Sequence, residues 1–304
     1  MLRGLAQVLP AEDIVTIVNT GDDEMIHGLH VSPDLDTVMY TLAGLADDQR
    51  GWGLAGETWN VMEYLEELGG ETWFRLGDKD LATHLYRTGR LSQGAPLSQV
   101  TAELAARLGV PARLLPMTDD EVRTRVRLSS GEEVSFQHYF VRLSHDVAIS
   151  AVRFHGIDEA RPAPGVMEAL AHAGAVIICP SNPVVSIGPI LAIEGVRAFL
   201  ADHRGRVVAV SPLIAGKALK GPADRMLVEL GGEASVVEVA RTYADVAGTL
   251  VIDETDREQA DLVEGAGCRA VVARAVMHDL RSAELLARAV LDAAGYAYST
   301  PGPR

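Results

Sequence analysis

The segment Ala175–Pro183, AVIICPSNP, decides the fold that we expect for this chain. Its five consecutive apolar residues are typical of a strand that is buried on both faces of a parallel sheet. The strand ends at Pro180, where the small polar residues Ser181 and Asn182 follow. A buried strand, a polar turn and a helical pattern together form the repeating unit of α/β proteins.

The same unit recurs on both sides of this segment. Val207–Val210 (VVAV) is a second buried strand, and Ile14–Asn19 (IVTIVN) is a similar apolar run near the amino terminus. Two weaker strands, Thr249–Ile252 and Arg269–Val272, each precede a helical pattern. This alternation predicts a Rossmann-like α/β fold, with a mainly parallel sheet and helices on both of its faces.

Apolar spacing and capping residues predict the helices. Ser32-Pro33 signals a helix start, because Ser is a preferred N-cap residue and Pro suits the first helical position. The predicted helices are Met1–Leu9, the segment that starts at Ser32, Glu57–Leu68, Asp78–Arg90 and Ser98–Leu108.

The chain changes character between Arg123 and Arg142. RTRVRL (Arg123–Leu128) and VSFQHYFVR (Val134–Arg142) have strand-like patterns, and SSGEE between them indicates a hairpin turn. We expect a β-hairpin insertion at about residues 118–147, at one side of the main sheet. A single α/β domain is then expected to span residues 1–304.

The composition excludes several classes of protein. The 304 residues are 48% hydrophobic, and 27 Lys and Arg against 42 Asp and Glu give a net charge of -15, which disfavours nucleic acid or an anionic membrane as a partner. Cys179 and Cys268 are the only cysteines, so we expect no disulfide framework. Without a secretory signal or an apolar run of about 18 residues, the expected location is cytoplasmic. The glycine-rich nucleotide motifs, the GxSxG nucleophile motif and HExxH are also absent.

Four aspartates follow the first apolar run: Asp22, Asp23, Asp34 and Asp36. The carboxyl ends of strands are where α/β sheets bind ligands, and carboxylates suit Mg²⁺. Asp34 and Asp36 lie about 200° apart around the predicted helix, so they cannot both face one site. The alternative is that all four are solvated acids, which are common near helix N-termini.

Other segments have residues that suit an anion or a planar ring. Arg75, together with an N-capping Asp78, precedes a predicted helix, and the turns Pro180–Pro189 and Ser211–Pro222 expose backbone N–H groups that suit phosphates. Ordinary capped helices and turns have the same residues. His27 and His30 lie in a loop without a nearby third ligand, which makes a zinc site improbable. The three tryptophans have the shape to flank a planar ligand, although packing is their more common role; they are Trp52, Trp59 and Trp73.

Five segments together resemble one family. The sequence resembles the 2-phospho-L-lactate (or phosphoenolpyruvate) transferases of coenzyme F420 biosynthesis along essentially the whole chain. The segments are NTGDDEMIHGLHVSPDLDTVMYTLAGL (Asn19–Leu45), RGWGLAGETWN (Arg50–Asn60), LGDKDLATHLYRTGRL (Leu76–Leu91), LLPMTDDEVRT (Leu114–Thr124) and PSNPVVSIGPIL (Pro180–Leu191).

The resemblance implies a group transfer between two small molecules. The donor is a guanosine diphosphate ester of lactate or enolpyruvate, and the residues do not distinguish the two. The acceptor is the deazaflavin FO, whose terminal ribityl hydroxyl attacks the phosphorus nearer the acid, so that GMP leaves. Mg²⁺ and a homodimer are further expectations from this resemblance.

The resemblance also assigns site residues. Asp36 and Arg75 match the positions that contact the deazaflavin, and Asp36 is the expected catalytic residue, which orients or deprotonates the hydroxyl. Asp22, Asp23 and Asp34 are expected to hold the metal or support the acceptor. Ser181 and Asn182 match a loop on the guanosine-nucleotide side.

The sequence departs from the family at its start. Members have a strand and a GGTGG-like loop before the helix that matches Leu2–Leu9, and here Met1 takes the place just before it. That loop is expected to cradle the donor phosphates, so a misassigned start codon or a truncated chain is the favoured explanation. The alternatives are a regulatory protein of the same fold that binds nucleotide-linked ligands, and a folded but inactive remnant.

Overall fold

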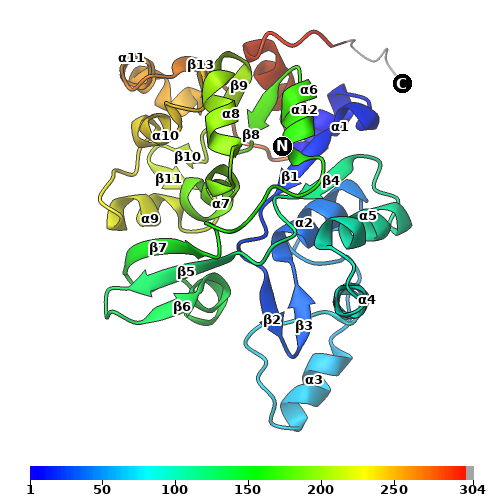
Figure 1. The fold of residues 1–304 in the computed structure, drawn as a ribbon. Coiled ribbons are helices and arrows are strands. Elements are labelled where there is room, and N and C mark those ends of the chain that lie inside the picture. Colours follow the sequence, from blue (N-terminus) through cyan, green and yellow to red (C-terminus); the bar gives the residue numbers. More distant parts are fainter. Residues whose placement is uncertain (299–304) are drawn as a thin grey trace. The chain divides into compact units, whose positions relative to one another are not determined.

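The computed structural model describes residues 1–298, which divide into two compact units (Figure 1). Unit 1 contains Met1–Ile14 and the chain from Gly165 onward, and unit 2 contains Val15–Pro164. Both units combine helices with strands that pair in parallel, which confirms the predicted α/β class. The single domain expected for residues 1–304 stays a prediction.

Unit 1 is built on a four-stranded parallel sheet with the strand order β13-β12-β9-β8. Every residue of β9 and β12 is buried. Because successive side chains of a strand point to opposite faces, this burial requires cover on both faces of the sheet. All four strands were predicted, and their bounds are Val176–Ile178 for β8, Val207–Val210 for β9, Thr249–Asp253 for β12 and Arg269–Ala273 for β13.

Two helices from distant parts of the sequence lie side by side in unit 1 (Figure 1). They are α1 (Leu2–Val8) and α12 (Leu280–Ala293), and Leu286 of α12 packs against valines of the sheet. A Cβ atom on Gly4 would lie only 2.1 Å from the backbone oxygen of Ala283. The two helix backbones can therefore approach this closely only because residue 4 has no side chain.

The remaining elements of unit 1 are short. Among the described residues, no single helix is long and apolar enough to cross a membrane. Two segments that meet at a bend of 91°, Pro183–Ala192 and Val196–Asp202, together have the length and composition of a membrane span. The buried core helices of a protein can meet the same criterion. The helices are α6 (Val166–His172), α7 (Gly188–Ala192), α8 (Val196–Asp202), α9 (Ala223–Glu229), α10 (Val236–Tyr243) and α11 (Ala260–Gly265), and β10 (Leu213–Ile214) forms a hairpin with β11 (Lys217–Ala218).

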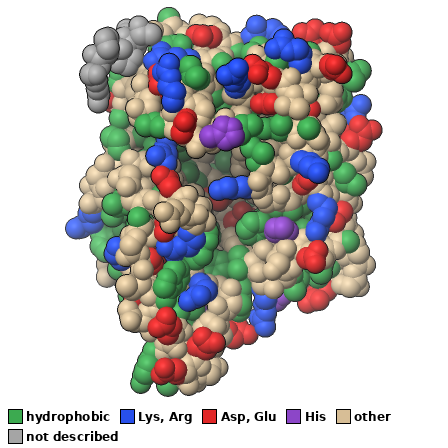
Figure 2. Space-filling view, turned by 180° about the vertical axis from the view of Figure 1, so that it is seen from behind, with side chains coloured by type: hydrophobic (Ala, Val, Ile, Leu, Met, Phe, Trp, Pro, Cys, Tyr) green, Lys and Arg blue, Asp and Glu red, His purple; other side chains and the backbone are tan. Residues whose placement is uncertain are grey.

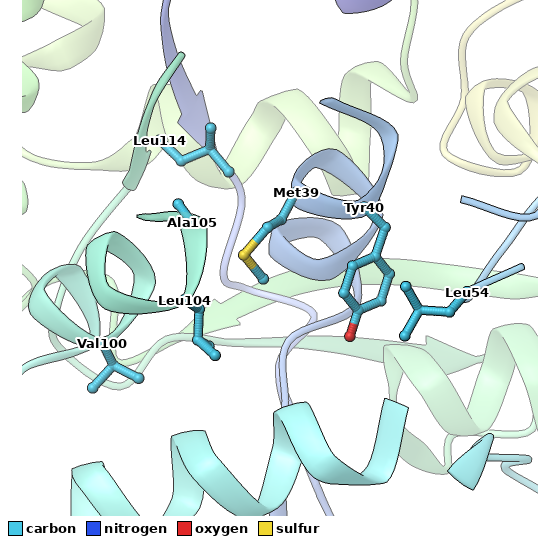
Figure 3. Close-up of a cluster of buried hydrophobic side chains, with 7 residues drawn as sticks. All are labelled: Met39, Tyr40, Leu54, Val100, Leu104, Ala105 and Leu114. Carbon is cyan, nitrogen blue, oxygen red and sulfur yellow. The ribbon is translucent and has the colours of Figure 1, made fainter. Parts of the chain in front are cut away.

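Unit 2 begins with a parallel pair of strands, β1 (Val15–Val18) and β4 (Arg113–Pro116). The strand β4 was not predicted. Two helices, α2 (Pro33–Leu42) and α5 (Leu97–Arg107), pack beside this pair. Their shared core is shown in Figure 3, where Tyr40 of α2 lies beside Leu54; its buried residues are Met39, Tyr40, Leu54, Val100, Leu104, Ala105 and Leu114.

A three-stranded antiparallel sheet forms the predicted insertion. Its strand order is β6-β5-β7, and the hairpin of β5 (Arg123–Leu128) with β6 (Glu133–Ser135) confirms the prediction. The third strand, β7 (Ile149–His155), lies beyond the predicted end of the insertion. The strand predicted to reach Arg142 was wrong after Ser135, because His138–Arg142 forms a π-helical turn. The ring of Phe136 stacks on that of Phe140, 5.4 Å away, which requires the chain to coil.

A second hairpin, β2 (Glu24–Ile26) with β3 (Leu29–Val31), was not predicted. Its two turn residues, His27 and Gly28, have φ angles of 52° and 76°. Positive φ at both central positions is typical of the tight turn that matches the twist of paired strands. The predicted loop position of His30 was therefore wrong, since this residue lies on β3.

The helices α3 (Asn60–Glu67) and α4 (Asp78–Ser92) exchange their capping groups. Asp78 was predicted to cap its own helix, and this was wrong. Its carboxylate instead accepts the first two backbone N–H groups of α3, both at 3.1 Å. In return, Glu57 accepts the backbone N–H of Lys79 at 2.6 Å. This exchange explains why the helix predicted to begin at Glu57 begins three residues later.

We expect Gly4→Ala to lower the free energy of unfolding by about 1–3 kcal/mol, because the added methyl group meets the backbone of α12. The matched control is Gly89→Ala in α4, where a Cβ atom meets nothing within 4 Å. That change should raise stability by about 0.5–1 kcal/mol, the usual helical preference for Ala. Urea unfolding of both variants tests this, and equal effects would contradict the close contact of α1 with α12.

Candidate functional site

Buried polar residues of unit 2 gather where β1 ends and α2 begins. The chain turns sharply after β1, because Gly21 donates its backbone N–H to the side chain of Asn19 at 2.8 Å. Asn19 in turn donates to Asp34 Oδ2 at 2.9 Å. The insertion holds the same turn, since Gln137 donates to the backbone oxygen of Asp22 at 3.2 Å. Strand end, helix start and insertion thus converge on one loop.

Asp22, Asp23 and Asp34 form a group that we call the carboxylate cluster. Asp22 and Asp23 are buried, and Asp34 is partly exposed. Burial raises the pKa of Asp22 well above its ordinary range, and the charges of Asp34 and Asp23 raise it further. Burial also raises the pKa of Asp34 to about 6; the hydrogen bond from Asn19 opposes this shift and the charge of Asp23 adds to it. The cluster is therefore an electronegative site that a cation would stabilise.

Asp23 is held on one side by two neighbours. Its Oδ2 lies 2.8 Å from Nε2 of His30 and accepts the hydroxyl of Ser32 at 2.7 Å. Ser32 does occupy the N-cap position of α2, as predicted, but its side chain makes no capping bond and binds Asp23 instead. The helix start and the acidic loop are thereby fixed to each other.

The other side of the cluster has unused oxygen atoms. Among the described residues, Asp22 Oδ1, Asp23 Oδ1 and Thr20 Oγ1 are buried without a hydrogen-bond partner. A buried polar atom without a partner costs about 1–3 kcal/mol, so such atoms often serve a ligand. Mg²⁺ binds through one or two carboxylates and keeps several waters. The residues of the carboxylate cluster therefore fit this cation.

Asp36 belongs to a different group, although it is two residues from Asp34. Both of its carboxylate oxygens accept hydrogen bonds from Arg87, whose side chain is only 1% exposed. Nη1 of Arg87 also lies 3.3 Å from Nδ1 of His84. The prediction that Asp34 and Asp36 face different sites is confirmed.

This second group connects α2 to α4. Tyr40 of α2 donates its hydroxyl to Asp80 at 2.7 Å, and Nε2 of His84 lies 3.4 Å from the same carboxylate. The ligand atoms of Asp36, Asp80 and His84 lie within 4.8 Å of one another, as in a metal centre. However, the guanidinium of Arg87 already neutralises Asp36, so the group forms an ion-pair network.

Arg75 lies in neither group. Its side chain is exposed, and its guanidinium carbon lies 4.9 Å from the ring centroid of Trp59. The element before α4 is the helix α3 and not a strand, contrary to the predicted strand-to-helix junction, and the N-cap position belongs to Gly77. The structure therefore brings Asp22, Asp23 and Asp34 together, but gives Asp36 and Arg75 separate surroundings.

Ser181 and Asn182 lie in unit 1, in the short segment between β8 and the π-helical turn Pro183–Ile187. Asn182 accepts the backbone N–H of Val184 at 2.9 Å and thereby caps this turn. Both residues follow the carboxyl end of a parallel strand, where α/β sheets place ligands. Their nucleotide-binding role stays a prediction.

Three residues of the ion-pair network were not predicted from the sequence: Arg87, His84 and Asp80. Their spacing of four and three residues places them on one face of a helix, which is a readable signal. The pattern itself does not distinguish a solvated polar face from a buried one.

On the face seen in Figure 2, acidic and basic side chains are interspersed, so the acidic surplus of the sequence forms no single patch there.

Comparisons with known proteins agree on one family. The sequence profile described as 2-phospho-L-lactate transferase CofD matches residues 1–293. A protein of Kitasatospora aureofaciens named phosphoenolpyruvate transferase is 46% identical over an alignment of 298 residues, and the match covers 95% of this chain and 92% of that protein. Proteins of the same name from Streptomyces coelicolor and Mycolicibacterium smegmatis are 45% and 42% identical, over 95% and 93% of this chain and 92% and 88% of theirs.

Solved structures show a similar fold. Two crystal structures of a Bacillus halodurans protein, described in one of them as a member of the UPF0052 family, match with TM-scores of 0.60 and 0.61. They are 14% and 15% identical to this chain, and the match covers 95% of it and 94% of the other chain. At this identity the likeness shows the fold alone.

We expect Arg87→Met to lower the free energy of unfolding by about 3–5 kcal/mol, because it leaves the charge of Asp36 buried without a partner. The double variant Asp36→Asn/Arg87→Met should recover part of this loss, since neither charge remains. Urea unfolding of the single and double variants measures both effects.

The control for this experiment is an ion pair of similar geometry on the surface. Arg197 binds Asp245 at 2.6 and 2.8 Å, but both side chains are half exposed. Arg197→Met should cost only about 0–1 kcal/mol. Strictly additive losses in the Asp36 and Arg87 variants would contradict a coupled buried pair.

The raised pKa of Asp34 predicts a pH-dependent stability in the absence of divalent cations. Between about pH 4, the ordinary carboxyl pKa, and about pH 6, the folded chain holds a proton that the unfolded chain has lost. The contribution of Asp34 to stability is therefore lost as the pH rises through this window. Since Asp34 is partly exposed, the expected loss is about 1–2 kcal/mol.

Asp34→Asn removes this titration. Relative to the wild type, the variant should gain stability as the pH rises from about 4 to about 6. Unfolding at several pH values in the presence of EDTA measures it. A difference that does not change across this window would contradict the pKa assigned to Asp34.

Proposed function

Because this chain belongs to the 2-phospho-L-lactate transferase family, we propose that it transfers an enolpyruvyl phosphate group to the deazaflavin FO. The donor is a guanosine diphosphate ester of enolpyruvate. The terminal ribityl hydroxyl of FO attacks the phosphorus nearer the enolpyruvyl group, the bond from that phosphorus to the bridging oxygen breaks, and GMP leaves. The names of the relatives favour enolpyruvate over lactate.

The observation that carries this proposal is the carboxylate cluster. Transfer of a phosphate group requires charge neutralisation and alignment more than a strong base. Asp22 and Asp23 offer buried oxygens without partners, and burial together with the charge of Asp23 raises the pKa of Asp34 to about 6. These residues would hold Mg²⁺, which when bound would neutralise phosphate charge.

In this proposal Asp36 supports the acceptor, and Arg87 holds the carboxylate of Asp36 in place. A carboxylate has about four lone-pair sites, so Asp36 can accept a further hydrogen bond from a hydroxyl. Burial raises the pKa of Asp36, and the adjacent positive charge of Arg87 opposes this shift. Asp36 would orient the attacking hydroxyl and could take up its proton as the bond to phosphorus forms. Arg75 would bind the deazaflavin from the exposed surface of unit 2.

The nucleotide is assigned to unit 1. Ser181 and Asn182 would contact the guanosine part of the donor, because they follow the carboxyl end of β8. A homodimer and a cytoplasmic location, which the sequence suggested, stay predictions.

The test is a transfer assay with FO, the enolpyruvyl ester of guanosine diphosphate and Mg²⁺, in which GMP and the FO product are followed by chromatography and mass spectrometry. The wild type should form both in equal amounts, and EDTA should stop the reaction. Asp22→Asn should lower kcat by about a hundredfold, the scale of losing a group that supports transition-state charge. Arg75→Ala should raise KM for FO by about tenfold, as expected for a lost charged contact.

Asp245→Asn, which changes an exposed ion pair of unit 1, is the control and should leave both constants unchanged. A binding readout is independent of turnover, since Mg²⁺ should raise the Tm of the wild type but not that of Asp22→Asn. Binding of both substrates without release of GMP would instead favour a regulatory nucleotide-ligand-binding protein. A folded chain that binds neither substrate would contradict the proposed function.

A further inference from the structure

Three hydrogen bonds hold His30 between the carboxylate cluster and α4. Its Nε2 lies 2.8 Å from Oδ2 of Asp23. Its backbone N–H donates to the hydroxyl of Thr88 at 2.8 Å, and its backbone oxygen accepts Nη1 of Arg87 at 3.4 Å. Arg87 is the residue that also pairs with Asp36. His30 is therefore fixed to the buried ion-pair network at its backbone and to the carboxylate cluster at its side chain.

The hairpin of β2 with β3 brings this imidazole to its partner. Asp23 directly precedes β2, and His30 is the central residue of β3, seven positions later. The tight turn at His27 and Gly28 reverses the chain between them. An ionised carboxylate only accepts hydrogen bonds, so Nε2 carries the proton of this bond. The local fold thus aims one N–H donor of His30 at Asp23.

The two carboxylate oxygens of Asp23 have different surroundings. Oδ2 also accepts the hydroxyl of Ser32 at 2.7 Å, so two donors of the chain occupy it. Oδ1 is buried and, in the described part of the chain, has no hydrogen-bond partner. The whole residue is only 2% exposed, so bulk water does not serve this oxygen. One oxygen of the carboxylate is therefore held, and the other remains for a group from outside the chain.

His30 and Ser32 are placed to act through Asp23 and not as ligands of the cation. Mg²⁺ takes oxygen ligands, whereas imidazole suits zinc and other transition metals. The Nε2 proton of His30 and the hydroxyl proton of Ser32 are both directed to Asp23. In metal sites the ligating carboxylates are themselves hydrogen-bonded, and these partners orient the ligand. Both residues have the contacts that this orienting role requires.

We propose that His30 and Ser32 are positioning residues that set the affinity of the carboxylate cluster for Mg²⁺. By holding Oδ2 of Asp23, they fix the plane of this carboxylate and reserve Oδ1 for the cation. Without these donors the carboxylate would rotate more freely, and binding would have to order it first. This inference rests on the proposed function, which assigns Mg²⁺ to the cluster, and extends it to two residues that had no role in the transfer.

The test is Mg²⁺ binding to the complete chain without substrates, measured by isothermal titration calorimetry and by the rise of Tm with Mg²⁺ concentration. His30→Ala and Ser32→Ala should each raise the Kd for Mg²⁺ by about 10- to 100-fold, the usual range for losing a hydrogen-bond partner of a metal ligand. His30→Gln and Ser32→Thr each keep a donor, and they should recover most of the affinity.

The matched control is His27→Asn. His27 is the other histidine of the hairpin; it is exposed, and its φ of 52° is one that Asn adopts readily. This variant should bind Mg²⁺ with the Kd of the wild type. Far-UV circular dichroism and urea unfolding in EDTA show whether each variant is folded.

A second readout separates a positioning role from a catalytic one. In the transfer assay, His30→Ala and Ser32→Ala should need about 10- to 100-fold more Mg²⁺ for half of the maximal rate, and saturating Mg²⁺ should restore kcat. Asp22→Asn should remain slow at every Mg²⁺ concentration, because a ligand itself is missing. A low kcat in His30→Ala and Ser32→Ala that Mg²⁺ does not restore would contradict the positioning role.

The outcomes separate this inference from the proposed function. A wild-type Kd for Mg²⁺ in both folded alanine variants would overturn the inference and leave the proposed function intact. A raised Kd that neither His30→Gln nor Ser32→Thr reverses would also overturn it, since the donors would then not be the cause. If the folded wild type binds no Mg²⁺ in either measurement, the inference fails together with the metal role of the cluster.

Discussion

The buried ion pair of Asp36 with Arg87 is the interaction on which the arrangement of unit 2 depends. It joins the first turn of α2 to the middle of α4, and Tyr40 and Asp80 connect the same two helices one turn further on. Two charges removed from water are stable only as a pair with well-aligned hydrogen bonds, so the helices have little freedom to shift. Because Asp34 is on the same turn of α2, this constraint also positions the carboxylate cluster.

The strands of the unit 1 sheet were predictable because each contains a short apolar run, as in VVAV at Val207–Val210, and such runs are typical of strands buried on both faces of a parallel sheet. β4 was missed because its four residues begin with Arg and end with Pro, and only its pairing with β1 makes it a strand. The hairpin of β2 with β3 was missed because His27-Gly28 is an unusual tight-turn pair. Both elements are fixed by partners, and local composition says little about them.

For the site, geometry along one helix was predictable and contacts between segments were not. The angle between Asp34 and Asp36 follows from helical periodicity, and the structure separates them accordingly. Their partners could not be inferred, since Arg87 lies 51 positions after Asp36 in the sequence. Ser32 shows the same limit: its position as N-cap was predictable, but its hydroxyl binds Asp23 because that carboxylate is close in space.

The exchange of caps between α3 and α4 makes the two helix starts mutually dependent. Neither first turn is completed by its own residues, since Glu57 precedes α3 but serves α4, and Asp78 belongs to α4 but serves α3. Residues 57–79 should therefore open and close as one cooperative segment in amide hydrogen exchange. Because Trp59 lies inside this segment, its ring contacts with Arg50 and Arg75 would open and close together with both helix starts.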